Sequence, residues 1–139
     1  MDKKVITVQT VVNAPLEKVW KAWTEPEHIV QWAFAQDDWE APSAENDVRT
    51  GGKFKTVMAA KDKSVSFDFT GTYTNVDGHE VIEYDMDDGR HVSIRFEEVP
   101  EGVKITETFE MENENSEEKQ RSGWQAILEN FKKHAESMS

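Results

Sequence analysis

The sequence predicts an α+β domain in which a curved antiparallel β-sheet wraps around a long C-terminal α-helix, with two short helices after the first strand. Residues 116–138 place their large apolar side chains at helical spacing. Residues 48–111 instead alternate between apolar and polar positions and are divided by short turns. Short turns make consecutive strands pair as a meander, and bending that meander around the helix buries the apolar faces of both.

The composition indicates one globular domain spanning residues 1–139. The chain is 37% hydrophobic and contains five Trp and seven Phe, which is enough to bury a sizeable core. It has no cysteine, so disulfides and thiolate sites are excluded. No apolar run is long enough to span a membrane, and the first residues lack the apolar core of a signal peptide. We therefore expect a cytoplasmic protein that does not insert into membranes.

The chain is also strongly acidic. Its 16 Lys and Arg residues and 28 Asp and Glu residues give a net charge of −12. Nucleic acids and anionic membranes are bound through clustered basic side chains, so this charge argues against both as partners. Because the same charge repels other acidic surfaces, we expect a monomer.

The N-terminal part is predicted to contain one strand and two short helices. Residues 4–12 are rich in Val, Ile and Thr, which is typical of a β-strand. A helix is expected to begin at or near Pro15, with Asn13 or Ala14 as its N-cap. It should stop before Pro26, because the residue preceding a proline is disfavoured in the helical conformation. Pro26 can then open the second helix.

We predict a loop for residues 33–47, because this stretch is polar, contains Pro42 and shows no regular apolar period. Two aromatic residues, Phe34 and Trp39, interrupt it. Since exposed rings are unfavourable in water, we expect both to pack into the domain or to cover the mouth of a cavity.

Residues 48–111 are predicted to form a series of antiparallel strands. Gly51-Gly52 and Asp77-Gly78 are turn signals, and the second is typical of a tight hairpin. The strands are expected at residues 53–60, 64–75, 79–86, 90–99 and 103–111.

The C-terminal helix is predicted from Trp124, Ile127, Leu128 and Phe131, which fall at positions i, i+3, i+4 and i+7 of one face. Asn115 is the expected N-cap. Burying each of these large side chains is worth about 1.5–3 kcal/mol, so the face must pack against a broad surface. The strands that precede the helix supply that surface.

A curved sheet around a helix tends to leave an apolar space between them, which is the usual geometry of a ligand pocket. The inward-facing residues of the strands and the helix are expected to line this space, unless they fill it completely as an ordinary core. The candidate cavity residues are Trp32, Phe54, Met58, Phe67, Phe69, Tyr73, Tyr84, Met86, Phe96, Glu107, Phe109, Trp124, Leu128 and Phe131.

Glu107 is the one charged residue among these candidates. Alternation between Ile105 and Phe109 points its side chain inward, where an unpaired carboxylate is costly. It is therefore a candidate ligand handle or acid–base group. The simpler alternatives are an inward partner, such as Arg95 or Arg49, or a local bulge that turns the side chain outward.

No catalytic set, metal site or cofactor motif is evident. The four histidines are scattered, and no two of them lie at a helical spacing beside a carboxylate. Gly51-Gly52 lacks the helix start and the Lys-Ser/Thr pair of a phosphate-binding loop. We therefore expect no metal and no cofactor.

Several stretches resemble one protein family in the order expected for it. Residues 14–28, APLEKVWKAWTEPEH, resemble the opening of the activator of heat-shock-chaperone ATPase homologue family, and residues 47–54, DVRTGGKF, resemble its central motif. Phe69-Thr70-Gly71, followed by Gly123-Trp124, completes the similarity, which covers nearly the whole chain. The family belongs to the START and birch-pollen-allergen-like (SRPBCC) superfamily, so the resemblance implies a helix-grip fold.

The resemblance leaves three functions open, because one fold supports many activities. The first is non-enzymatic binding of a small apolar or amphipathic ligand, lipid-like or polyketide-like, between the sheet and the last helix. The second is a protein-interaction domain that stimulates a chaperone ATPase. The third is a cyclase-like or hydrolase-like enzyme with Glu107 or a tyrosine as the acid–base group.

Overall fold

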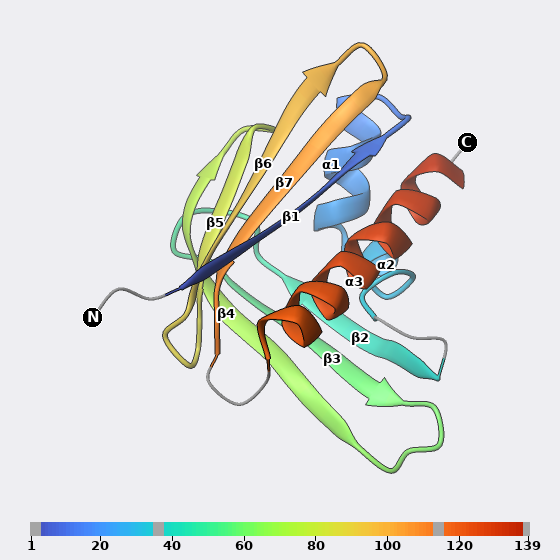
Figure 1. The fold of residues 1–139 in the computed structure, drawn as a ribbon, viewed down its shortest axis with the longest axis vertical. Helices are drawn as coiled ribbons and strands as arrows, with labels where there is room; N and C mark the ends of the chain where they lie inside the picture. Colours follow the sequence, from blue (N-terminus) through green and yellow to red (C-terminus); the bar gives the residue numbers. More distant parts are fainter. Residues whose placement is uncertain (1–3, 35–37, 113–115, 138–139) are drawn as a thin grey trace.

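A computed structural model describes residues 4–34, 38–112 and 116–137, and within them a curled antiparallel sheet cups a long helix (Figure 1). The helices are α1 (Leu16–Thr24), α2 (Pro26–Ile29) and α3 (Glu117–Ser137). The strands are β1 (Val5–Val12), β2 (Trp39–Asn46), β3 (Lys53–Ala60), β4 (Ser66–Asp77), β5 (Val81–Met86), β6 (His91–Val99) and β7 (Gly102–Glu110).

The sheet has the strand order β1-β7-β6-β5-β4-β3-β2, with antiparallel pairing throughout. Strands β2 to β7 form a meander because short turns join each strand to the next. Strand β1 pairs with β7 at the opposite edge from β2, and α1 and α2 connect these two edges. The structure therefore confirms the predicted fold class of a curved sheet around the C-terminal helix, with short helices after the first strand.

The two prolines define the short helices largely as predicted. Pro15 has an extended backbone (φ −64°, ψ 150°) and acts as the N-cap of α1, so the helix begins one residue later than Pro15. Pro26 is the first residue of α2. Trp32 lies beyond α2 and donates its indole N–H to the carbonyl of Ala22 (2.9 Å), which ties this segment to α1.

The predicted loop at residues 33–47 is wrong over most of its described part, because Trp39–Asn46 forms strand β2. This strand lies at the edge of the sheet and pairs with β3 alone, so it needs no continuous apolar face. The pairing register shifts between Glu40 and Ser43, on either side of Pro42. A proline has no N–H to donate, and an irregularity in an edge strand is where a sheet accommodates it.

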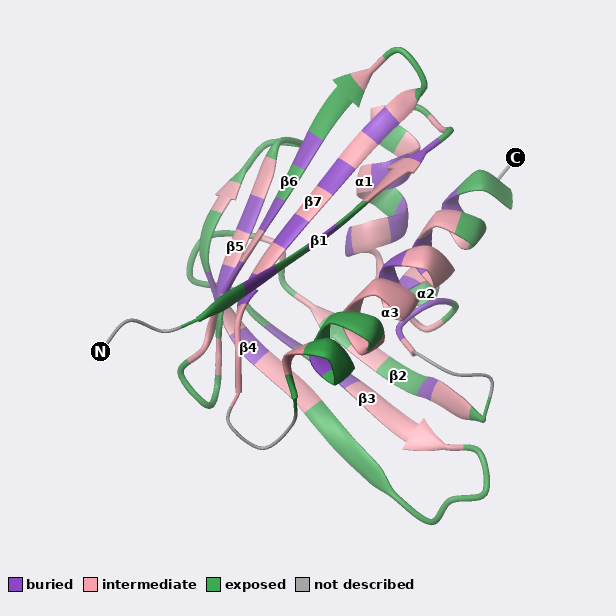
Figure 2. Cartoon of the chain, viewed as in Figure 1, coloured by how far each residue is buried: buried purple, intermediate pink, exposed green. Residues whose placement is uncertain are grey.

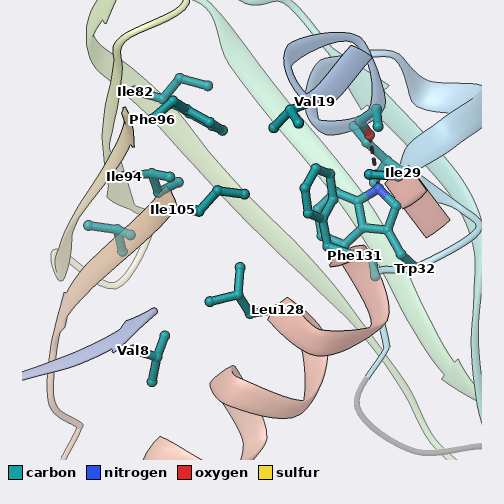
Figure 3. Packing of buried hydrophobic residues seen from close by; sticks show 14 of the residues in the cluster. Val8, Val19, Ile29, Trp32, Ile82, Ile94, Phe96, Ile105, Leu128 and Phe131 are labelled. Carbon is teal, nitrogen blue, oxygen red and sulfur yellow. Dashed lines mark hydrogen bonds between the residues drawn. The ribbon is translucent and has the colours of Figure 1, made fainter. Parts of the chain in front are cut away.

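The core lies between the concave face of the sheet and the helices. Along β7, buried residues alternate with partly exposed ones, as Figure 2 shows. Phe131 of α3 is fully buried, and its ring packs edge-on against Trp23 and Trp32, with centroids 4.8 and 5.0 Å away. Figure 3 shows Leu128 pointing from the same helix towards Ile105 of the sheet.

Polar contacts fix both ends of α3. The Ser116 hydroxyl accepts the backbone N–H of Lys119 (3.1 Å), so Ser116 caps the helix, whereas the predicted cap, Asn115, lies outside the described residues. Near the C-terminal end, Lys132 Nζ donates to the carbonyl of Val11 (2.7 Å). The described helices include none that is long and apolar enough to cross a membrane.

Truncating Phe131 tests how far the fold depends on the packing of α3. We predict that Phe131→Ala lowers the free energy of unfolding by about 3–5 kcal/mol, because it opens a cavity among Trp23, Trp32 and the sheet. Val65→Ala is the control, because Val65 is 54% exposed and its truncation should change the value by at most about 0.5 kcal/mol. Urea denaturation measures both values. Equal, small losses would contradict the packing described here.

Candidate functional site: a cavity between the sheet and the C-terminal helix

A cavity of about 280 Å³ remains between the concave face of the sheet and α3. Its walls come from strands β2 to β7, from α1 and α2 and the segment after them, and from α3. Of the candidate residues named from the sequence, the structure places the following along it: Trp32, Phe54, Met58, Phe67, Phe69, Tyr73, Tyr84, Met86, Glu107, Trp124 and Leu128.

The structure places the other three candidates in the packed core and not along the cavity. Phe96 is covered by two rings of α1, Trp20 and Trp23, at centroid distances of 5.4 and 5.6 Å. Phe109 is stacked under Trp124 of α3, with centroids 3.9 Å apart and planes 10° apart. Phe131 is enclosed by tryptophan rings from α1 and the segment after α2. All three face inward as expected, but helix side chains cover them, and alternation along a strand cannot reveal that cover.

Several residues that were not among the cavity candidates also line the cavity. Thr56 and Ile94 share the inward faces of β3 and β6 with named candidates, so their strand period was a usable signal. Asn46 had no such signal, because its strand was predicted as a loop. The remaining members of this set are Trp23, Ile29, Ala33, Arg90, Glu112, Gln120 and Ile127.

One side of the cavity is a continuous group of aromatic rings. Phe54 is central, with its centroid 4.7 Å from that of Tyr84, 5.2 Å from that of Tyr73 and 5.6 Å from that of Phe69. Phe69 also packs edge-on against Trp124 at 6.3 Å. Tilted and edge-to-face contacts of this kind restrict the orientations of the rings, so this wall is largely pre-formed.

A hydrogen-bonded chain forms a polar part of the wall. The Tyr73 hydroxyl donates to Asn46 Oδ1 (2.5 Å), and Asn46 Nδ2 donates to the carbonyl of Thr24 (2.7 Å). The chain thus connects β4, β2 and the end of α1. Burial raises the pKa of Tyr73 well above its ordinary value, so its hydroxyl stays protonated and can only act as a neutral group.

Glu107 lies on β7 with its side chain facing the cavity and is only 6% exposed. Its neighbours on the adjacent strands are Val8 and Ile94, which are apolar and buried. Burial raises the pKa of Glu107 to about 8. Within the described part of the chain, its carboxyl group has no hydrogen bond or ion pair to another side chain.

The expected partners of Glu107 are engaged or exposed elsewhere. Arg49 Nε lies 2.8 Å from Asp47 Oδ2 in the Gly-Gly turn. Arg95 is exposed, and alternation along β6 turns it away from its buried neighbours Ile94 and Phe96. The simpler alternatives, a basic partner or an outward bulge, are therefore wrong, and the inward carboxyl predicted by alternation is observed.

Two parts of the cavity wall differ in their contacts and exposure. Near the start of α3, the side-chain amide of Gln120 exchanges hydrogen bonds with the backbone of Glu112, and Arg90 Nε pairs with Asp88 (2.9 Å). On the β3–β4 side, Phe67 lines the cavity but is 48% exposed, so its ring lies at the mouth. The ring of Trp39 packs against Phe67 with a centroid distance of 5.9 Å.

No group of three or more His, Asp or Glu side chains that could hold a metal ion occurs in residues 4–34, 38–112 and 116–137. The cavity wall combines apolar and aromatic side chains with the buried carboxyl group of Glu107 and with a smaller set of other polar side chains: Asn46, Thr56, Tyr73, Tyr84, Arg90, Glu112 and Gln120.

A curled antiparallel sheet around a long C-terminal helix, with a mostly apolar cavity between them, defines the helix-grip class of START-like, or SRPBCC, proteins. Within this class, the chain belongs to the family described as Activator of Hsp90 ATPase homolog 1-like protein, whose profile matches residues 13–136. This membership confirms the resemblance seen in the sequence.

Solved structures agree with this assignment. The AHSA1-like protein from Aeromonas hydrophila is 40% identical, with a TM-score of 0.91 over 96% of this chain and 93% of that one. Chr148 from Cytophaga hutchinsonii is 50% identical, with a TM-score of 0.82 over 94% and 91% of the two chains. CV1439 from Chromobacterium violaceum, at 22% identity and a TM-score of 0.86 over 97% and 99%, shares the fold. No curated protein matches the sequence.

The buried carboxyl group of Glu107 should make folding stability depend on pH. The folded state keeps this proton up to a pH of about 8, whereas the unfolded chain loses it near 4.5. Unfolding therefore releases a proton between these values, so stability falls as the pH rises through this window. By pH 8, this one group lowers the free energy of unfolding by roughly 5 kcal/mol relative to its value at low pH.

We predict that Glu107→Gln removes this part of the pH dependence. The variant should match the wild type near pH 5 and exceed its stability by several kcal/mol at pH 8.5, because glutamine has no proton to lose. Urea denaturation of both proteins at pH 5, 7 and 8.5 measures the difference in their free energies of unfolding. Contributions from other titrating groups cancel in this difference, because they are the same in both proteins. Parallel stability curves would show that the carboxyl group is solvated or paired.

Proposed function

We propose that this protein binds a small apolar or amphipathic ligand in the cavity between the sheet and α3. The observation that supports this most directly is the cavity itself, which is lined mainly by aromatic and aliphatic side chains and includes few polar groups. Pockets of this composition are typical of small-molecule sites. SRPBCC proteins also commonly bind hydrophobic ligands.

The size of the cavity limits which ligands can fit in it. At about 280 Å³ the cavity is slightly smaller than the usual range for ligand pockets, which is about 300–1,000 Å³. A compact molecule of one or two rings, or a short chain, fits this space better than a whole two-chain lipid. The exposed ring of Phe67 at the mouth gives such a ligand an apolar entry surface.

Filling the cavity tests this proposal. Thr56 is buried and lines the cavity, whereas Val57 follows it on β3 and faces the other side of the sheet. We predict that Thr56→Phe weakens binding of the neutral probe 1-ethylnaphthalene at least tenfold, because the new ring occupies the space, and that Val57→Phe changes it less than twofold. Titration of ¹⁵N-labelled protein, followed at the Trp124 indole, measures both. Unchanged affinity in Thr56→Phe, or no binding by the wild type, would refute the proposal.

Chaperone regulation is the second candidate, and the family to which the chain belongs is the observation that favours it. In this case the protein would bind an Hsp90-type chaperone from the same cell and change its rate of ATP hydrolysis. An ATPase assay with that chaperone tests this directly. Turnover that stays constant up to saturating amounts of the protein would exclude it.

A further inference from the structure

The carboxyl group of Glu107 has no charged or hydrogen-bonding partner among the described side chains, and it faces the cavity, where a ligand can reach it. The residue is 6% exposed, lines the cavity, and has apolar neighbours, Val8 and Ile94, on both adjacent strands. A buried carboxylate without a partner is costly, and a cation that forms a hydrogen-bonded ion pair with it offsets that cost. A ligand that supplies the missing partner therefore gains affinity at this position.

The other titratable and charged groups of the cavity do not supply that partner. Tyr73 on β4 donates its hydroxyl to Asn46, and Arg90 in the β5–β6 turn is paired with Asp88. Glu112, after β7, has the wrong sign of charge to serve as a partner. Tyr84 on β5 is neutral, because burial and the charge of Glu107 raise its pKa well above 10, and within the described residues its hydroxyl makes no hydrogen bond to Glu107.

The aromatic wall of the same cavity also suits a cation. The rings of Phe54, Phe69, Tyr84 and Trp124 line the same cavity and pack against one another. Aromatic faces attract cations, and the attraction is stronger where water is excluded. The net charge of −12 further raises the concentration of cations around the protein.

We propose that the cavity selects small apolar ligands that bear one protonated amine, with Glu107 as the anionic partner and the aromatic wall around the ammonium group. This inference rests on the proposed function, because it names the ligand class of the same cavity. It assigns Glu107 the role of a specificity-determining residue.

The proposal makes ligand affinity depend on pH in one direction. Free Glu107 has a pKa of about 8, so at neutral pH it must lose its proton before it can pair with an ammonium group. Affinity for an amine should therefore rise nearly tenfold for each pH unit up to about 8, with one proton released. A ligand that accepts a hydrogen bond from the protonated carboxyl group would show the opposite trend above pH 8.

Two probes of nearly the same shape test this selectivity: 1-naphthylmethylamine, which is cationic, and 1-ethylnaphthalene, which is neutral. We expect the amine to bind the wild type at least tenfold more tightly at pH 8, with the preference shrinking at pH 6. Glu107→Gln should abolish the preference, so that the two probes bind this variant with affinities within about threefold of each other. Glu98→Gln, an exposed carboxylate on β6, is the control for net charge and should retain the preference. Calorimetric titration measures affinities and proton release.

The outcomes separate this inference from the function on which it rests. Equal binding of the two probes at every pH, or a preference that survives in Glu107→Gln, would overturn the amine selectivity and leave apolar ligand binding intact. Tighter binding of the anionic probe 1-naphthylacetate would overturn it in the same way. Failure of the wild type to bind any of the three probes would overturn both proposals.

Discussion

The packing of α3 against the concave face of the sheet is the interaction on which the rest of this structure depends. A sheet of this length exposes a large apolar face, and bending around one helix buries it without a second sheet. Leu128 and Phe131 are fully buried in the contact. The helix is held at its C-terminal end by the hydrogen bond from Lys132 to β1. The position of α3 therefore decides how much space is left inside.

That space is unevenly filled. At the end nearer α1, the rings of Trp23, Trp32 and Phe131 contact one another and close the gap between the helices. At the other end, Trp124 lies flat on Phe109 and covers it, its edge contacts Phe69 of the aromatic wall, and both Trp124 and Phe69 line the cavity. Trp23 and Trp32 therefore serve in both places, since they pack against Phe131 and also line the cavity.

The alternation along β7 places the carboxyl group of Glu107 inside the protein, although burying it lowers stability. Its neighbours on the same face of β7, Val103, Ile105 and Phe109, are all buried, so the strand cannot turn Glu107 outward without exposing them. The chain consequently holds a carboxyl group inside an apolar cavity at a cost in stability. Costs of this kind are concentrated at functional sites in natural proteins.

The strongly periodic parts of this molecule could be predicted from sequence. The alternation of β7 and the helical spacing in α3 gave the curved sheet, the enclosed helix and the inward position of Glu107. Strand β2 could not be found in this way, because an edge strand with Pro42 and polar residues has no apolar period. Because Asn46 lies on this strand, its role as the hydrogen-bond partner of Tyr73 could not be predicted either. Periodicity also could not distinguish Phe96 from Phe54, because contact with α1 decides which of them is covered.

The most direct measurement of the central claim is an NMR titration of the Glu107 side-chain carboxyl carbon in ¹³C-labelled protein, with the resonance assigned from Glu107→Gln. If the helix and sheet enclose this group in an apolar cavity, its pKa should lie near 8. A pKa close to 4.5, the ordinary value for glutamate, would mean that water or a cation reaches the carboxyl group. The enclosed cavity described here would then be incorrect.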